Sequence, residues 1–161
     1  MTNQNLAESY VPAPEQRFSM PELAPEWYRA MIDLDRASRT AVDPVIGELV
    51  RTRASQINGC AFCLDMHTAD ARKEGEQEHR LHTLPAWRET PYFTARERAA
   101  LALTEAVTLV TVGHVPDDVY QEAAKHFDPQ ELAQLIAVII TINSWNRIAV
   151  ASRLSPAPKQ S

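Results

Sequence analysis

The chain has 161 residues, of which 45% are hydrophobic and 23% charged, a balance typical of one globular domain and not of a disordered chain. Sixteen Lys and Arg against 21 Asp and Glu give a formal net charge of −5, which argues against nucleic-acid or anionic-membrane partners. The longest apolar run, Leu135–Ile140, is far shorter than the roughly 20 residues of a membrane helix. The N-terminus also lacks the basic and apolar blocks of a signal peptide. We therefore expect a cytoplasmic protein.

Four prolines and scattered polar residues in positions 1–25 predict an irregular N-terminal arm. From about Glu26 the apolar residues take a helical spacing, and we expect the first of them (Trp27, Tyr28, Met31, Ile32 and Leu34) to fill the core along one helix face. The helical pattern continues to residue 153. The expected organisation is one helical domain over 26–153, followed by a flexible C-terminal tail over 154–161.

A pair of helices joined by a tight turn is expected in the first half of this domain. Asp43 is a suitable N-cap and Pro44 a suitable first residue for a helix, and Asn58-Gly59 is a strong turn signal that ends it. A second helix is expected from Cys60 to about Gly75, where the glycine serves as a C-terminal cap.

The second half of the chain also contains helix signals and lacks a sustained two-residue alternation typical of strands. Thr94 and Glu97 form one capping box, and Asp128 and Glu131 form a second one before the most apolar stretch of the sequence. Further helices are expected over residues 77–84, 94–113 and 116–126 and from 128 onwards. The predicted fold class is all-α, a compact bundle of six to eight helices.

The two cysteines of the chain, Cys60 and Cys63, are the strongest indication of function. On a helix, Cys60, Cys63 and His67 lie at positions i, i+3 and i+7 and share one face. The first turn of a helix stabilises a thiolate, and a histidine one turn beyond can exchange a proton near neutral pH. A disulfide closing so short a loop would add little stability, so a redox or metal-binding pair is favoured over a structural one.

Glu48 is predicted to join this group through the turn. It precedes Asn58 by ten positions and His67 follows Asn58 by nine, so the two side chains come level in an antiparallel hairpin. A carboxylate beside the imidazole would fix its tautomer. The order Glu48, His67, Cys63, Cys60 is therefore a candidate proton relay.

The residues alone leave other interpretations open. The two cysteines could be inert core residues, or Cys60, Cys63, His67 and Glu48 could be the four ligands of a zinc ion in a non-enzymatic, oligomeric protein. Among other polar residues in apolar segments, Glu105 is either a structural carboxylate or part of the site lining. Asn143 and Asn146 belong either to a buried hydrogen-bond network or to a subunit contact.

The segment Gln56-Ile57-Asn58-Gly59-Cys60, followed by the pattern Cys-x-x-Cys-x-x-x-His, resembles the carboxymuconolactone decarboxylase superfamily, specifically its alkylhydroperoxidase D-like branch. The stretch over 142–147 is similar to the same branch, and the resemblance extends over residues 20–153. It implies an alkylhydroperoxidase D-like helical fold, assembly as a homotrimer or homohexamer, and thiol-dependent reduction of hydroperoxides.

The resemblance also implies roles for individual residues. Cys63 would attack the peroxide, Cys60 would resolve the product to a disulfide, and Glu48 and His67 would form the relay. No cofactor is implied beyond an external dithiol electron donor, for which a lipoyl group and thioredoxin are candidates. The sequence departs from well-studied members at Phe62, where those have histidine.

The same superfamily offers an alternative function, a decarboxylase or lactone enzyme, although that branch lacks the cysteine pair. The roles of the two sulfurs also stay open. Helix-dipole reasoning favours Cys60 as the more acidic thiol, whereas the resemblance favours Cys63 as the attacking one.

Overall fold

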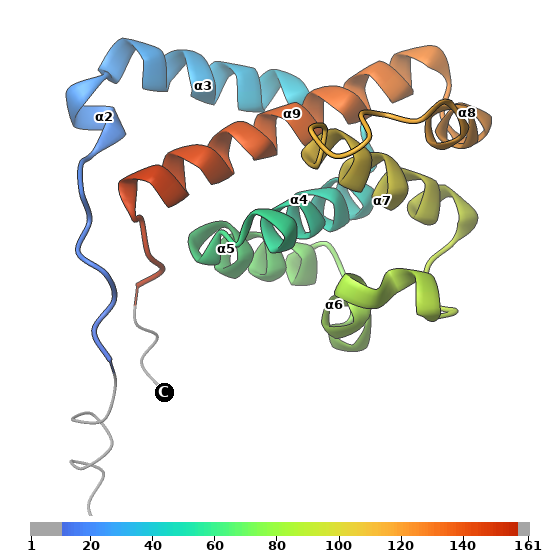
Figure 1. Cartoon of the computed structure of the whole chain (residues 1–161), viewed down its shortest axis with the longest axis horizontal. Coiled ribbons are helices and arrows are strands. Elements are labelled where there is room, and N and C mark those ends of the chain that lie inside the picture. Colours follow the sequence, from blue (N-terminus) through green and yellow to red (C-terminus); the bar gives the residue numbers. More distant parts are fainter. Residues whose placement is uncertain (1–10, 158–161) are drawn as a thin grey trace, which may run out of the picture.

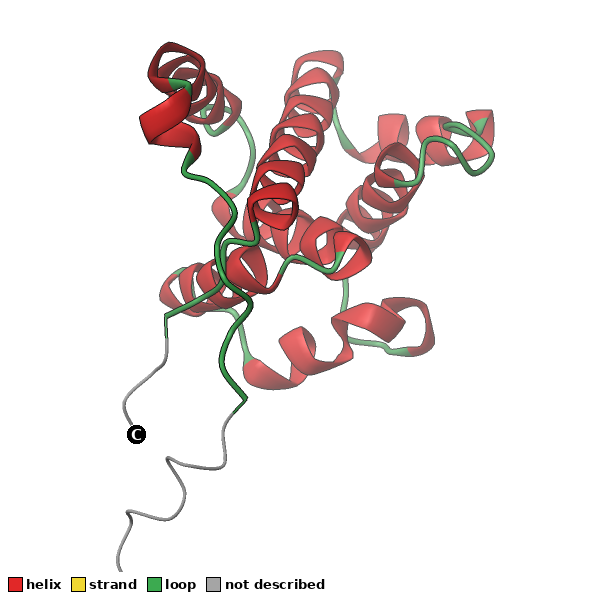
Figure 2. Cartoon of the chain, turned by 60° about the vertical axis from the view of Figure 1, so that its left-hand side comes forward, coloured by secondary structure: helices red, strands yellow, loops and turns green. Residues whose placement is uncertain are grey.

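The computed structural model describes residues 11–157, and within that range it consists of α-helices, one 3-10 helix and connecting loops, with no strand (Figures 1 and 2). The expected all-α bundle of six to eight helices is confirmed, since eight α-helices are found in the described part of the chain. With the labels of Figure 1 the α-helices are α2 Met20–Leu23, α3 Pro25–Ser38, α4 Pro44–Asn58, α5 Ala61–Lys73, α6 Glu78–Thr83, α7 Ala95–Thr108, α8 Asp117–His126 and α9 Pro129–Ser152. The 3-10 helix η1, Leu84–Glu89, lies between α6 and α7.

Helix α9 runs through the middle of the molecule and packs against α3, α4, α5, α7 and α8 (Figure 1). Its inward residues Leu135, Val138 and Ile139 are completely buried against Val50 of α4 and Leu103 of α7. In the described part of the chain, α9 is long and apolar enough to cross a membrane by length and composition, although the uninterrupted apolar run 135–140 is short. Half of its most apolar 18-residue segment is buried inside the structure. Such burial is typical of the central helix of a helical core.

Local capping signals locate the helix starts correctly. The Asp128 carboxylate accepts hydrogen bonds from the backbone N–H groups of Gln130 and Glu131, and Glu131 bonds back to the N–H of Asp128. Thr94 and Glu97 form the same reciprocal box at the start of α7. These side chains satisfy backbone donors that the first helical turn leaves without partners.

The predicted hairpin is formed by α4 and α5. Asp43 caps α4 by accepting from the backbone N–H groups of Val45 and Ile46, and Gly59 ends the helix with a φ of 65°. That left-handed conformation favours glycine because it has no Cβ. The second helix begins one residue later than expected, at Ala61, so Cys60 is its N-cap rather than a member of its first turn.

The N-terminal region differs from the expected arm over 1–25. Helix α2 lies inside that range. The segment before it, residues 11–19, passes alongside the C-terminal end of α9, where the backbone N–H of Arg17 donates to the Ser152 carbonyl over 2.8 Å (Figure 2). The expectation that the apolar face of α3 fills the core is wrong at Trp27, Ile32 and Leu34, which are 40–47% exposed. Met31 is buried, and Tyr28 is half-buried. Among the helices, α3 packs mainly on α9 and α2, so most of its circumference stays uncovered.

At the other end, the predicted tail over 154–161 is described only as far as residue 157, and residues 158–161 lie outside the described range. Arg153 ends α9 with a φ of 58°. Leu154 then packs back on the cluster that contains both cysteines. The beginning of the predicted tail therefore belongs to the packed structure.

Candidate active site

The two cysteines lie side by side at the start of α5, where α4, α5 and α9 meet. Both are free thiols and almost completely buried, and Ala54, Ile142 and Ala149 surround them. The backbone N–H of Cys63 donates to Sγ of Cys60 over 3.3 Å. The Cys60 sulfur is therefore turned toward the first turn of α5, where Cys63 lies.

This contact gives the two thiols different acidities. The hydrogen bond from the Cys63 side chain lowers the pKa of Cys60 to about 7; burial opposes this, and the backbone N–H of Cys63 and the Asn146 amide support it. The same hydrogen bond, together with burial and the charge on Cys60, raises the pKa of Cys63. Near neutral pH the pair therefore shares one proton, with the negative charge on Cys60, which agrees with helix-dipole reasoning.

A cavity of about 500 Å³ lies beside Cys63. Cys63 and His67 belong to its wall, whereas Cys60 does not. Much of the lining is apolar and comes from α3, α5, α9 and the segment after α9, with Ile32, Phe62, Met66, Trp145, Ile148 and Leu154 among the lining residues. Gln16 and Ser19 of the N-terminal arm complete it. Phe62 thus supplies apolar surface beside the thiols at the position where the resemblance implies histidine.

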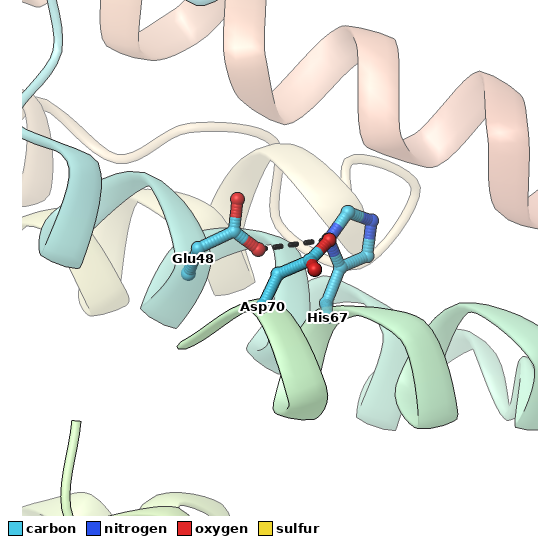
Figure 3. A group of neighbouring side chains, drawn as sticks. All are labelled: Glu48, His67 and Asp70. Atoms are coloured by element: carbon cyan, nitrogen blue, oxygen red, sulfur yellow. Dashed lines mark hydrogen bonds and ion pairs between the residues drawn. The ribbon is translucent and has the colours of Figure 1, made fainter. Parts of the chain in front are cut away.

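Glu48 and His67 meet across the hairpin as the spacing predicts (Figure 3). His67 Nδ1 lies 2.8 Å from Glu48 Oε2, and both side chains are buried. Burial raises the pKa of Glu48, but His67 and the guanidinium groups of Arg51 and Arg39 outweigh it and lower that pKa. Because Glu48 is then a carboxylate, Nδ1 of His67 carries the hydrogen, which leaves Nε2 as the proton acceptor of a ring that lines the cavity.

The charges around Glu48 bear on whether a metal ion would bind here. Oε1 of Glu48 lies 2.8 Å from Nη1 of Arg51 and 3.8 Å from Nη1 of Arg39. Among the described residues, one group of three donors lies within 4.8 Å, namely Glu48, His67 and Asp70, and it includes neither cysteine (Figure 3). The four-ligand zinc set is therefore not gathered. A cation bound at Glu48 would also meet two arginines, which disfavours it.

The remaining candidates from the sequence lie outside the cavity lining. Glu105 is structural, since it accepts hydrogen bonds from Arg53, Arg88 and Trp87. Asn143 and Asn146 belong to a buried hydrogen-bond network with Asn58. Sequence reasoning did not find the contact between Asn146 and the sulfurs. The available signal was an amide at an inward position of the most apolar helix.

Comparison with known proteins places this fold in a family. Residues 25–106 match the carboxymuconolactone decarboxylase family. An uncharacterized protein of Bacillus subtilis strain 168, YdfG, is 44% identical over 137 residues, which cover 84% of this chain and 93% of that protein. The chain therefore belongs to the carboxymuconolactone decarboxylase family, as the cysteine motif indicated.

Solved structures agree with this assignment. The Agrobacterium tumefaciens protein ATU0492, described as a protein of unknown function and a putative antioxidant defence protein AhpD, has a TM-score of 0.84 and 35% identity over 89% of this chain and 100% of its own. An uncharacterized peroxidase-related protein from Silicibacter sp. TM1040 has a TM-score of 0.70 at 22% identity, over 82% of this chain and 69% of its own. At that identity the likeness shows the fold alone. The alkylhydroperoxidase D-like fold is thus confirmed.

Replacing Glu48 by glutamine is expected to destabilise the protein by about 3 kcal/mol at pH 7, because it leaves Arg51 buried without its counter-charge. The lowered pKa of Glu48 means that its contribution is present above the ordinary pKa of a glutamate and is lost as the pH falls through the lowered value. Urea unfolding of both proteins at several pH values measures this. Asp33→Asn, which removes an exposed ion pair with Arg36, is the control and should leave stability unchanged. Equal stability of Glu48→Gln and the parent at pH 7 would contradict the assignment of charge.

The ultraviolet absorbance of the thiolate is expected to titrate with a midpoint near pH 7, the pKa of Cys60. Cys60→Ser should remove this transition from the neutral range, because burial still raises the pKa of Cys63 after the contributions of Cys60 are gone. Cys63→Ser should retain a transition at lower than ordinary thiol pKa, since the serine hydroxyl can donate to Cys60 in place of the thiol. The reverse pattern in the two variants would place the resting thiolate on Cys63.

Proposed function

We propose that the protein is a thiol-dependent hydroperoxide reductase in which Cys63 attacks the substrate and Cys60 completes a disulfide. The observation that carries the proposal is a pair of adjacent buried thiols, one of them on the wall of an apolar cavity beside a buried His67–Glu48 pair. The description of the Agrobacterium relative as a putative antioxidant defence protein supports the same chemistry.

Cys63 is the attacking residue in this scheme because its side chain meets the cavity. Its proton must leave before the attack, and His67, one helical turn further along α5, accepts it at Nε2 while Glu48 holds the ring. The Cys63 thiolate attacks the distal peroxide oxygen, the O–O bond breaks, and Cys63 becomes a sulfenic acid. The alkoxide that leaves takes the proton back from His67 and departs as an alcohol.

The low pKa of Cys60 serves the second step. Cys60, already a thiolate near pH 7 after releasing its proton to solvent, attacks the sulfur of the Cys63 sulfenic acid. The S–S bond forms, the S–O bond breaks, and the hydroxide takes a proton from solvent and leaves as water. The balance is two thiols and one hydroperoxide giving one disulfide, one alcohol and one water. An external dithiol then reduces the disulfide, and a lipoyl group or thioredoxin would serve as that donor.

The scheme requires no cofactor beyond this dithiol. The apolar lining of the cavity, Phe62 included, favours an organic hydroperoxide over hydrogen peroxide, because an alkyl or aryl group would cover surface that water wets poorly. A homotrimer or homohexamer in the cytoplasm is part of the same proposal.

A decarboxylase or lactone enzyme is the alternative that the family name suggests. Such a reaction has no use for a thiol pair that shares a proton, so activity toward a lactone should survive replacement of both cysteines. A debrominase, Bmp8, has a TM-score of 0.71 at 17% identity over 80% of this chain and 70% of its own, and it was solved as a cysteine-to-alanine variant in complex with 2,3,4-tribromopyrrole. That likeness concerns the fold and does not assign a substrate here.

Cys63→Ser is expected to abolish turnover of cumene hydroperoxide with dihydrolipoamide as donor, because no sulfur then faces the cavity. Cys60→Ser should consume at most one peroxide per chain, since the sulfenic acid forms but is not resolved. Consumption of peroxide is followed directly. Undiminished turnover by Cys63→Ser would refute the proposal.

His67→Gln is expected to lower the rate of peroxide reduction by about 100-fold, the usual effect of losing a proton-transfer residue. His82→Gln is the matched control, because His82 is exposed and pairs with Glu78 at the surface of α6. Equal rates for both variants would show that the His67–Glu48 pair is structural.

A further inference from the structure

Asn146 of α9 is a buried polar residue that the proposed mechanism leaves without a role. Its side chain is completely inaccessible to solvent and lies between Ile142 and Ala149, which pack against Cys60 and Cys63. Residues 142, 146 and 149 share one helix face, so that face presents an amide to the sulfurs within an otherwise apolar contact. A buried amide is costly unless its donors and acceptor are all used.

The orientation of this amide is fixed by two neighbours from α4. Asn58 Nδ2 donates to Asn146 Oδ1 over 2.9 Å, and Asn146 Nδ2 donates to Ser55 Oγ over 3.0 Å. The Ser55 hydroxyl donates its single hydrogen to the carbonyl of Arg51 over 2.7 Å, so it can only accept a hydrogen bond from Asn146. A flipped amide would lose both contacts, and Nδ2 must therefore point toward the side of Ser55 and the cysteines.

One N–H of Asn146 is left after the bond to Ser55, and it lies on the side of the cysteines. The amide lowers the pKa of both thiols. We propose that Asn146 is the hydrogen-bond donor that stabilises the negative charge of the thiol pair, and that Asn58 is a positioning residue that holds the donor in place.

A donor within reach of both sulfurs has a particular use in the proposed reaction, on which this part of the inference rests. A negative charge lies on Cys60 at rest, and Cys63 gains one when His67 takes its proton before the attack. Because the Asn146 amide favours the thiolate form of both residues, it lowers the cost of this second negative charge without a rearrangement of the helices.

Asn143, one turn earlier in α9, shows what a purely structural amide looks like. It also accepts from Asn58, over 3.0 Å, but its own Nδ2 donates to Thr108 and to the carbonyl of Ile139. It is not among the groups that affect either cysteine pKa. Asn143 therefore provides a control within the same network.

Asn146→Leu tests the proposal, because leucine keeps the approximate size of the side chain, offers the sulfurs no amide hydrogen and adds no charge. The midpoint of the thiolate absorbance titration should rise by about one pH unit, which corresponds to about tenfold less thiolate at pH 7. The identical change at the control position, Asn143→Leu, should leave the midpoint unchanged. Circular dichroism and thermal unfolding establish that each variant is folded.

Asn58→Ala is the second variant, needed in case the first does not fold. It removes the contact that fixes the amide while leaving Asn146 present, so a smaller rise of the midpoint is expected. Unchanged midpoints in the folded variants overturn the proposal. If the midpoint shifts but the parent protein reduces no hydroperoxide, the role of Asn146 stands and the proposed function fails. If the parent reduces hydroperoxide and the midpoint does not shift, the proposed function stands and the role of Asn146 fails.

Discussion

The turn at Asn58-Gly59 is the constraint on which the site depends. Gly59 adopts a left-handed conformation that ends α4 and reverses the chain within two residues, which makes Cys60 the N-cap of α5. A cysteine at that position accepts the N–H of Cys63 on its sulfur, and this brings the two thiols together. The same reversal sets α5 antiparallel to α4 and brings His67 against Glu48. One turn thus determines both the thiol pair and the position of the His67–Glu48 pair beside it.

A division of labour between the two sulfurs follows from this geometry. The acidic thiol, Cys60, lies behind the wall of the cavity, and the thiol on the wall, Cys63, keeps its proton at rest. Acidity and access therefore point to different residues. A reaction that needs an attacking thiol and a resolving thiol can use both residues. The accessible thiol attacks the substrate, and the acidic thiolate, which the substrate does not reach, reacts with the sulfenic acid that forms beside it. The buried position of both sulfurs also limits their oxidation by molecules that do not enter the cavity.

Local signals in the sequence were sufficient for the hairpin and for the helix starts. Asp43, Asn58-Gly59 and the two capping boxes act within a few residues, so their effect does not depend on the rest of the fold. The pairing of Glu48 with His67 could be predicted as well, since counting residues from a turn fixes which positions come level in a hairpin.

Features that depend on distant packing could not be predicted in the same way. The apolar residues of α3 have the spacing of a buried helix face, yet most are exposed because few helices cover α3. The residues of α3 alone do not indicate how many helices pack on it. The cavity requires the N-terminal arm, α5 and the end of α9 to meet, and the contact of Asn146 with the sulfurs joins residues far apart in the sequence. The zinc alternative also needed coordinates, because ligand types alone do not show whether four donors converge.

The most direct test of the proposed chemistry is peptide mass spectrometry of the reduced protein after one equivalent of cumene hydroperoxide. We expect that both thiols disappear together, that one peroxide is consumed per chain, and that a Cys60–Cys63 disulfide forms which dihydrolipoamide reverses. Two intact thiols beside unconsumed peroxide would contradict this chemistry, as would a lasting sulfenic acid on Cys63 with Cys60 unchanged.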